Sequence, residues 1–189
     1  MVKVESSPKA YVREYIYGRK THPTKNMSFG SLMADGLEKE EATGDLLLDF
    51  VIATLPKYEL RDIAFEVDLK DGKDIIKLLA KPDSAKADYS EFIEYKTSVN
   101  RWTQKDADKS GQVTFYALCM WIKTGKIPKR IRLICVLTKK DENGKIVLKD
   151  EEEPIYLETK RTMLDLIKMS IRIKKAWAKI NKLCEEELL

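Results

Sequence analysis

Glu91-Phe-Ile-Glu-Tyr-Lys-Thr-Ser98 is the stretch that decides the fold of this chain. Apolar residues precede charged ones in it, which is typical of a strand that delivers charges to a sheet edge or cleft. We predict a strand over residues 91–96. Because successive side chains of a strand point to opposite faces, Glu94 and Lys96 share a face and Tyr95 points to the other. Taken alone, the Glu94–Lys96 pair is more typical of a weak ion pair on an exposed strand, and only its context favours a site.

Outward from this stretch, hydrophobic periodicity and turn signals divide the chain into blocks of helix and strand. Helices are predicted over residues 28–40, 46–55, 104–123 and 162–187, and strands over 63–68, 74–80, 131–138, 145–148 and 155–159. The order is helices, a β-meander, a helix, a strand pair and a helix. This order predicts an α/β (α+β) fold with a central mixed β-sheet flanked by helices. We expect an N-terminal arm over residues 1–27 and a single domain over residues 28–189.

The composition narrows the classes of protein. The 189 residues carry a net charge of +4, which suits a nucleic-acid partner without requiring one. Cys119, Cys135 and Cys184 are far apart and His22 is the only histidine, so the common zinc spacings are excluded. Two of these cysteines lie in apolar runs, which indicates reduced thiols and a cytoplasmic location. The chain has no signal-peptide pattern and no membrane-spanning run, so we expect no membrane contact.

Asp83 and Glu94 are the candidate metal ligands. A loop of about ten residues before the charged strand is long enough to bring Asp83 beside Glu94. Two neighbouring carboxylates make an oxygen-rich site of the kind that Mg²⁺ or Mn²⁺ prefers, and the backbone carbonyl of Tyr95 would add a further oxygen. Lys96 beside such a site would position a water molecule or offset the charge of a phosphoryl group. The pattern therefore favours hydrolysis of a phosphodiester.

Gln112 and Tyr116 lie four residues apart in a predicted helix, so they line one stripe of it. Alone, Tyr116 is more typical of a half-buried core residue with a hydrated hydroxyl. With the acidic residues upstream, a role in the site is favoured for both.

Pro82-Asp83, Glu94-Tyr95-Lys96-Thr97 and Gln112-Val-Thr-Phe-Tyr116 together resemble the PD-(D/E)xK nuclease superfamily. Within it, the RecB-like and phage lambda exonuclease-like branch is the most similar. The resemblance covers about residues 28–138 and implies a restriction-endonuclease-like core. It implies that Asp83 and Glu94 bind the metal, that Lys96 is the catalytic lysine, and that Gln112 and Tyr116 place DNA or brace the site. Some RecB-like nucleases hold an iron–sulfur cluster with four cysteines, but the three here are dispersed, so no cluster is expected.

One position departs from the pattern of the family. Many RecB-like members carry Gly-x-x-x-His or Gly-x-x-x-Glu on the first core helix, and here Gly30 is followed by Ala34 at that place. Glu38 lies one helical turn later on the same face, whereas Asp35 points about 100° away. We therefore favour Glu38 over Asp35 as an additional acidic residue near the metal. The alternative is that both face solvent.

Basic residues nearest the predicted site are the expected DNA contacts. Arg101 and Lys105 follow the charged strand, with Trp102 between them. Such cations contact phosphates, and an aromatic ring such as that of Trp102 stacks on an unpaired base. We interpret the basic residues of the C-terminal helix as a solvated face, because acidic residues such as Asp165 accompany them.

The sequence thus predicts a Mg²⁺-dependent deoxyribonuclease. The branch that it resembles implies an exonuclease of phage or prophage recombination or repair. The same resemblance leaves room for a recombination or single-strand-binding partner protein and for an oligomer. Two alternatives stay open, namely a non-catalytic DNA-binding or assembly module that keeps the nuclease fold, and a restriction-like endonuclease. The departure at Ala34 motivates the first of them.

Overall fold

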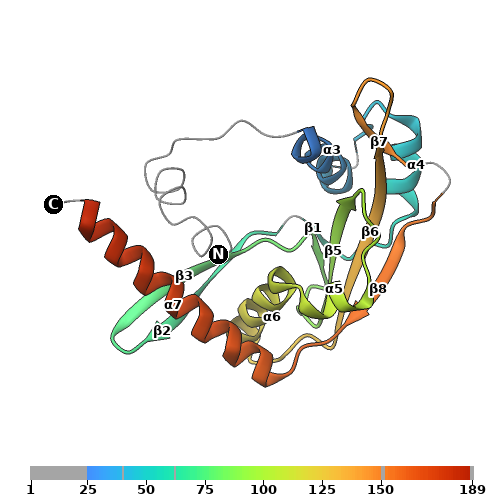
Figure 1. The fold of residues 1–189 in the computed structure, drawn as a ribbon. Coiled ribbons are helices and arrows are strands. Elements are labelled where there is room, and N and C mark those ends of the chain that lie inside the picture. Colours follow the sequence, from blue (N-terminus) through green and yellow to red (C-terminus); the bar gives the residue numbers. More distant parts are fainter. Residues whose placement is uncertain (1–24, 40, 62, 150–151, 188–189) are drawn as a thin grey trace.

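The computed structural model of this protein describes residues 25–39, 41–61, 63–149 and 152–187 (Figure 1). Most of the predicted arm, residues 1–27, lies outside these ranges, and its last three residues begin the first helix, α3 (Lys25–Lys39). Within the described part of the chain, no helix combines the length and the apolar character that crossing a bilayer requires.

A mixed sheet forms the centre of the molecule. Its strands follow the order β1 (Leu60–Arg61), β4 (Ser84–Ala85), β5 (Glu91–Ser98), β6 (Arg130–Lys140) and β7 (Ile146–Leu148), and β8 (Ile155–Thr159) also pairs with β6. Strands β5 and β6 run parallel over the whole of β5, and the other pairs are antiparallel. The near-continuous apolar run of β6 fits its place between β5 on one edge and β7 and β8 on the other, with both of its faces covered.

Helices cover both faces of this sheet. They are α3, α4 (Leu46–Thr54), α5 (Gln104–Lys109), α6 (Gly111–Thr124) and α7 (Met163–Glu187). Alternate residues of β5 belong to two separate cores, because strand side chains alternate between faces. Phe92 packs with α6, α7 and a β-hairpin, whereas Ile93 and Tyr95 pack with α3 and α4. The predicted class, a mixed sheet flanked by helices, is confirmed.

The predicted β-meander is wrong. Strands β2 (Phe65–Asp71) and β3 (Asp74–Ala80) pair with each other in a separate two-stranded sheet and do not join β5. The turn signal is correct, since Gly72 takes the left-handed conformation, with φ of 61°. One face of the hairpin buries Phe65, Val67 and Ile76 in the core beneath α6, and this tertiary contact takes the place of strand pairing with β5.

The single helix predicted over residues 104–123 is two helices. Ser110 separates α5 from α6, and its hydroxyl accepts a hydrogen bond from the backbone N–H of Val113 as the N-cap of α6. The buried guanidinium of Arg161 holds this junction by donating to the carbonyl oxygens of Ala107 (2.9 Å) and Ser110 (3.3 Å). The break fixes where α6 begins, and therefore where Gln112 lies.

Gly36 marks a close approach between α3 and the segment that leads into and through α4. A Cβ atom at this position would lie 2.7 Å from Cδ1 of Ile52 and 2.8 Å from Cγ2 of Thr43. Glycine weakens a helix in isolation, but here its missing side chain allows close packing. The contact fixes α3, another face of which lines the candidate site.

Candidate active site

A cavity of about 340 Å³ opens at the C-terminal end of β5, between α3 and α6. It is lined by residues of α3, of the loop before β4, of β5 and of α6, namely Gly30, Met33, Ala34, Leu37, Glu38, Asp83, Glu94, Tyr95, Lys96, Thr97 and Gln112. The motif residues of the sequence therefore converge on one space, although 29 positions separate Asp83 from Gln112.

The edge of the sheet explains how Asp83 reaches this cavity. Strand β4 pairs with β5 only as far as Ile93, so the second half of β5 has no strand on that side among the described residues. There Oδ2 of Asp83 accepts a hydrogen bond of 2.7 Å from the backbone N–H of Tyr95. The N–H and C=O of one strand residue point to the same edge, so the carbonyl of Tyr95 also points toward the side of Asp83.

Glu94 is the buried charge of the site. Its side chain is 2% exposed and lies on the α6 face of β5, where its Oε1 accepts from Nζ of Lys96 at 2.5 Å. Burial, and then the neighbouring charge of Asp83, raise the pKa of Glu94 to about 8. Burial also raises the pKa of Asp83, although the N–H of Tyr95 and the charge of Lys96 oppose the rise. Two carboxylates thus share a space in which neither is well solvated.

A polar chain connects Lys96 to α6. Nζ of Lys96 donates to Oε1 of Gln112 at 2.7 Å, and Nε2 of Gln112 donates to Oη of Tyr116 at 3.0 Å. Tyr116 is 8% exposed and its ring also meets the ring of Phe92 edge-on, with centroids 6.2 Å apart. Gln112 and Tyr116 therefore hold the lysine in place, and Tyr116 is at the same time the core residue that its apolar surroundings suggested.

The donor set fits a hard divalent cation. Oε2 of Glu94 is buried and has no hydrogen-bond partner among the described residues, next to a second desolvated carboxylate. Such a pair is satisfied by a shared proton or by a cation, and two carboxylates with one carbonyl oxygen suit Mg²⁺, which keeps several of its waters. No group of three or more His, Cys, Asp and Glu side chains with metal-binding geometry occurs in the described part of the chain.

Glu38 and Asp35 lie in different places. Glu38 lines the cavity together with Ala34, whereas Asp35 pairs with Lys39 at 3.2 Å on the exposed side of α3. Of the two candidates, Glu38 alone is placed to act at the site, although it does not complete a set of three metal ligands with Asp83 and Glu94.

The three expected DNA contacts lie outside the cavity. Arg101 forms an ion pair of 2.5 Å with Glu152, Trp102 is half-buried against the core on the α6 side, and Lys105 is exposed on α5. The structure does not bring these residues to the carboxylates, and their contact with DNA stays a prediction.

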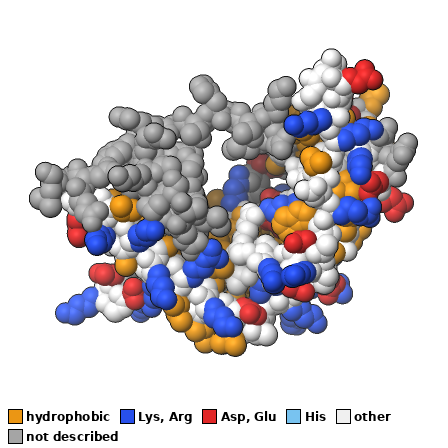
Figure 2. Space-filling view, viewed as in Figure 1, with side chains coloured by type: hydrophobic (Ala, Val, Ile, Leu, Met, Phe, Trp, Pro, Cys, Tyr) orange, Lys and Arg blue, Asp and Glu red, His pale blue; other side chains and the backbone are white. Residues whose placement is uncertain are grey.

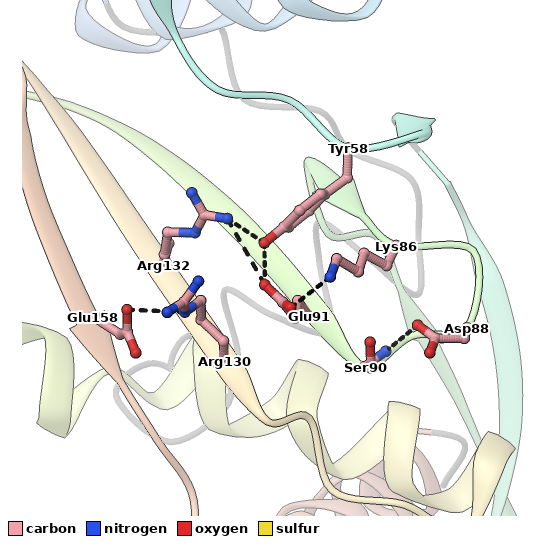
Figure 3. A network of polar contacts seen from close by, with 8 residues as sticks. All are labelled: Tyr58, Lys86, Asp88, Ser90, Glu91, Arg130, Arg132 and Glu158. Atoms are coloured by element: carbon pink, nitrogen blue, oxygen red, sulfur yellow. Dashed lines mark hydrogen bonds and ion pairs between the residues drawn. The ribbon is translucent and has the colours of Figure 1, made fainter.

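A second polar network, which the sequence did not reveal, holds the N-terminal end of β5 (Figure 3). Glu91 accepts from Nζ of Lys86 at 2.6 Å and from the hydroxyl of Tyr58, which in turn accepts from the guanidinium of Arg132. The hydrogen bonds from Lys86 and Tyr58 lower the pKa of Glu91. Because these partners come from β6 and from two loops, only the folded chain brings them together, and no local sequence motif predicts the network. The network anchors the strand that carries the site.

Comparison with known proteins supports the fold through a solved structure. No protein-family model matches the sequence, and no curated protein does. A solved structure that matches is that of a "Putative exonuclease" from Eubacterium rectale, with a TM-score of 0.56 over 92% of this chain and 74% of that chain. The two sequences are 13% identical. At this identity the likeness establishes the fold alone, so this chain has a mixed α/β fold like that of a protein named as an exonuclease.

Proposed function

We propose that this protein is a metal-dependent deoxyribonuclease that hydrolyses DNA phosphodiester bonds. The observation that carries the proposal is the convergence of Asp83, Glu94 and Lys96 in one cavity, with a buried carboxylate oxygen left unpaired. The fold shared with the structure named an exonuclease supports the same class of reaction.

Asp83, Glu94 and the carbonyl of Tyr95 would hold Mg²⁺ or Mn²⁺. A bound divalent cation lowers the pKa of a water molecule and offsets the charge that develops on the phosphoryl group. Asp83 reaches the site while its Oδ2 is fixed by the N–H of Tyr95, so one of its oxygens is held in a set orientation. Binding of the cation would also remove the repulsion between two desolvated carboxylates, which keeps both ionised at neutral pH.

Lys96 is the proposed catalytic lysine. Its Nζ lies between Glu94 and Gln112, and its side chain is 23% exposed, so it faces the cavity and not bulk solvent. From there the ammonium group donates to a phosphoryl oxygen or orients the attacking water. Gln112 and Tyr116 act as positioning residues, because they fix the ammonium group through hydrogen bonds.

Cleavage of linear and covalently closed DNA in Mg²⁺ or Mn²⁺ tests this proposal. We expect the wild type to degrade DNA and Lys96→Ala to lose at least about 100-fold in rate, the scale of a charge-stabilising group. Lys140→Ala, which removes an exposed lysine at the end of β6, is the matched control and should cleave normally. Thermal unfolding of all three proteins shows whether the fold is retained. A folded Lys96→Ala protein with full activity would remove Lys96 from the mechanism.

The choice of substrate separates the finer assignments. Degradation of linear DNA alone supports an exonuclease, as the RecB-like and lambda exonuclease-like resemblance implies, and with it a role in phage or prophage recombination or repair. Cutting of closed circles supports the restriction-like endonuclease.

A non-catalytic DNA-binding module is the second candidate. Ala34 lines the cavity where many of the RecB-like nucleases that the sequence resembles carry a histidine or glutamate, and the described residues contain no group of three carboxylates that could hold a metal ion. Metal-independent DNA binding without cleavage in either metal would favour this candidate.

A further inference from the structure

Five cations follow one another along the exposed flank of α7. Their spacing alternates between four and three residues, which keeps them on one side of a helix. They are Lys168, Arg172, Lys175, Lys179 and Lys182, referred to below as the α7 stripe, and each is exposed. The opposite side of α7 buries Leu166, Met169 and Ile173 in the core. Figure 2 shows lysine and arginine side chains gathered over the part of the surface where α7 lies in Figure 1.

The acidic residues that accompany this helix lie only at its two ends. No Asp or Glu occurs between Asp165 and Glu185. Asp165 is engaged locally, since its Oδ2 accepts from the N–H of Thr162 at 2.8 Å. Like charges three and four residues apart destabilise a helix, so the α7 stripe is unfavourable for the free protein. The exposure of these side chains agrees with the interpretation of this face as solvated, but the accompanying acidic residues lie at the ends of the helix and not along its middle turns.

Two cations at the centre of the α7 stripe, Lys175 and Lys179, form no ion pair with an acidic side chain among the described residues. Lys174, which lies off the stripe, pairs with Asp71 of β2 at 3.2 Å. Lys175 and Lys179 thus present full charges to solvent at the centre of the stripe.

The α7 stripe passes beside the candidate active site. A Cβ atom on Gly111 would lie 3.4 Å from Nη1 of Arg172. Gly111 precedes Gln112, which lines the cavity and accepts a hydrogen bond from Lys96. A polyanion that leaves the cavity past the start of α6 would therefore meet Arg172 first. From Lys168 to Lys182 the stripe is about 21 Å long, which corresponds to about six base pairs of duplex.

We propose that the α7 stripe binds the phosphodiester backbone of the substrate DNA where the duplex leaves the cavity. The inference rests on the proposed function, because DNA is identified as the polyanion by the proposed cleavage of DNA in the cavity. An anionic membrane is the competing partner, since Leu164, Ile167 and Ile171 are exposed beside the stripe. The α7 stripe lies next to the cavity where Arg172 approaches Gly111, and this position favours DNA over a membrane.

Salt dependence of DNA binding tests the proposal without relying on cleavage. Binding of a long labelled duplex is measured by fluorescence anisotropy in chelator over a series of salt concentrations. Each lost phosphate contact reduces the slope of log K against log salt by about 0.9. We expect Lys175→Gln/Lys179→Gln to reduce this slope by about two and to weaken binding. Lys140→Gln/Lys145→Gln removes two exposed lysines, one at the end of β6 and one just before β7, and is the matched control that should bind as the wild type does.

Three results would overturn the proposal. They are an equal change in both double variants, no binding of DNA by the folded wild type, and binding to anionic phosphatidylserine vesicles in place of DNA. A duplex shorter than about six base pairs does not extend along the stripe, so the stripe variant should bind it like the wild type. Cleavage is assayed in parallel. If the stripe variant weakens DNA binding but the wild type does not cleave DNA, the α7 stripe binds DNA and the proposed nuclease activity is wrong. If the wild type cleaves DNA but the stripe variant binds it normally, the nuclease activity stands and the role of the α7 stripe is wrong.

Discussion

At the scale of single residues, Glu94 makes the stability of the metal-free protein depend on pH. Its pKa rises from 4.5 to about 8 on folding, chiefly because of burial. The folded state then holds a proton that the unfolded state has released, so this stabilisation is complete below pH 4.5 and is lost as the pH rises through about 8. The raised pKa of Asp83 acts in the same direction.

We therefore expect the free energy of unfolding, measured with urea in chelator, to fall by a few kcal/mol between about pH 5 and pH 8.5. Glu94→Gln should remove most of this fall, because a neutral amide has no proton to release. Mg²⁺ should stabilise the wild type more at the higher pH. An unchanged pH dependence in the variant would assign the effect to other groups.

Asp83→Asn separates metal binding from folding at the other carboxylate. The amide oxygen can still accept from the N–H of Tyr95, but the negative charge is lost. We expect the Mg²⁺ concentration for half-maximal cleavage to rise by about tenfold or more, with the thermal midpoint nearly unchanged. A Mg²⁺ titration of cleavage rate measures it. An unchanged titration would exclude Asp83 as a ligand.

At the scale of elements, the junction of α5 and α6 depends on Arg161. This side chain is 7% exposed and also donates to the hydroxyls of Thr114 and Thr159, each at 2.7 Å. We expect Arg161→Met to lower the free energy of unfolding by at least about 2 kcal/mol, because it leaves buried oxygen atoms without a hydrogen-bond donor. Arg161→Lys should restore little of this stability, since one ammonium group cannot reach the several acceptors that the planar guanidinium bonds. Urea unfolding measures both variants, and a loss below about 0.5 kcal/mol in Arg161→Met would contradict this role.

Elements with a strong local pattern could be predicted, and those that depend on distant partners could not. The apolar run of β6 and the Asp71-Gly72 turn signal before β3 gave both strands nearly their observed limits. The approach of Asp83 to Glu94 was predicted from the loop length together with the resemblance to the nuclease superfamily. The place of the β2–β3 hairpin beneath α6 did not, because its alternation fits either sheet. Nothing in the sequence around Arg161 predicts its burial, and only the folded structure shows it.

At the scale of the whole molecule, the two cores meet along β5 and β6. Both faces of this parallel pair are covered, by α6 on one side and by α3 and α4 on the other. We expect amides of β5 and β6 to exchange with deuterium only on global unfolding, and those of α7 beyond Trp177 to exchange much faster. Hydrogen exchange followed by mass spectrometry tests this order. Equal protection in the two regions would contradict a core centred on the parallel pair.

The bond from Asp83 to the N–H of Tyr95 has an evolutionary consequence. One carboxylate serves both the proposed chemistry and the closure of an open sheet edge, whereas the structural role of Lys96 is to pair with the buried carboxylate of Glu94. A descendant that lost its activity could therefore replace Lys96 and Glu94 together, but selection for a stable fold would still demand a hydrogen-bond acceptor at position 83. Inactive homologues should keep Asp or Asn there and vary jointly at Glu94 and Lys96.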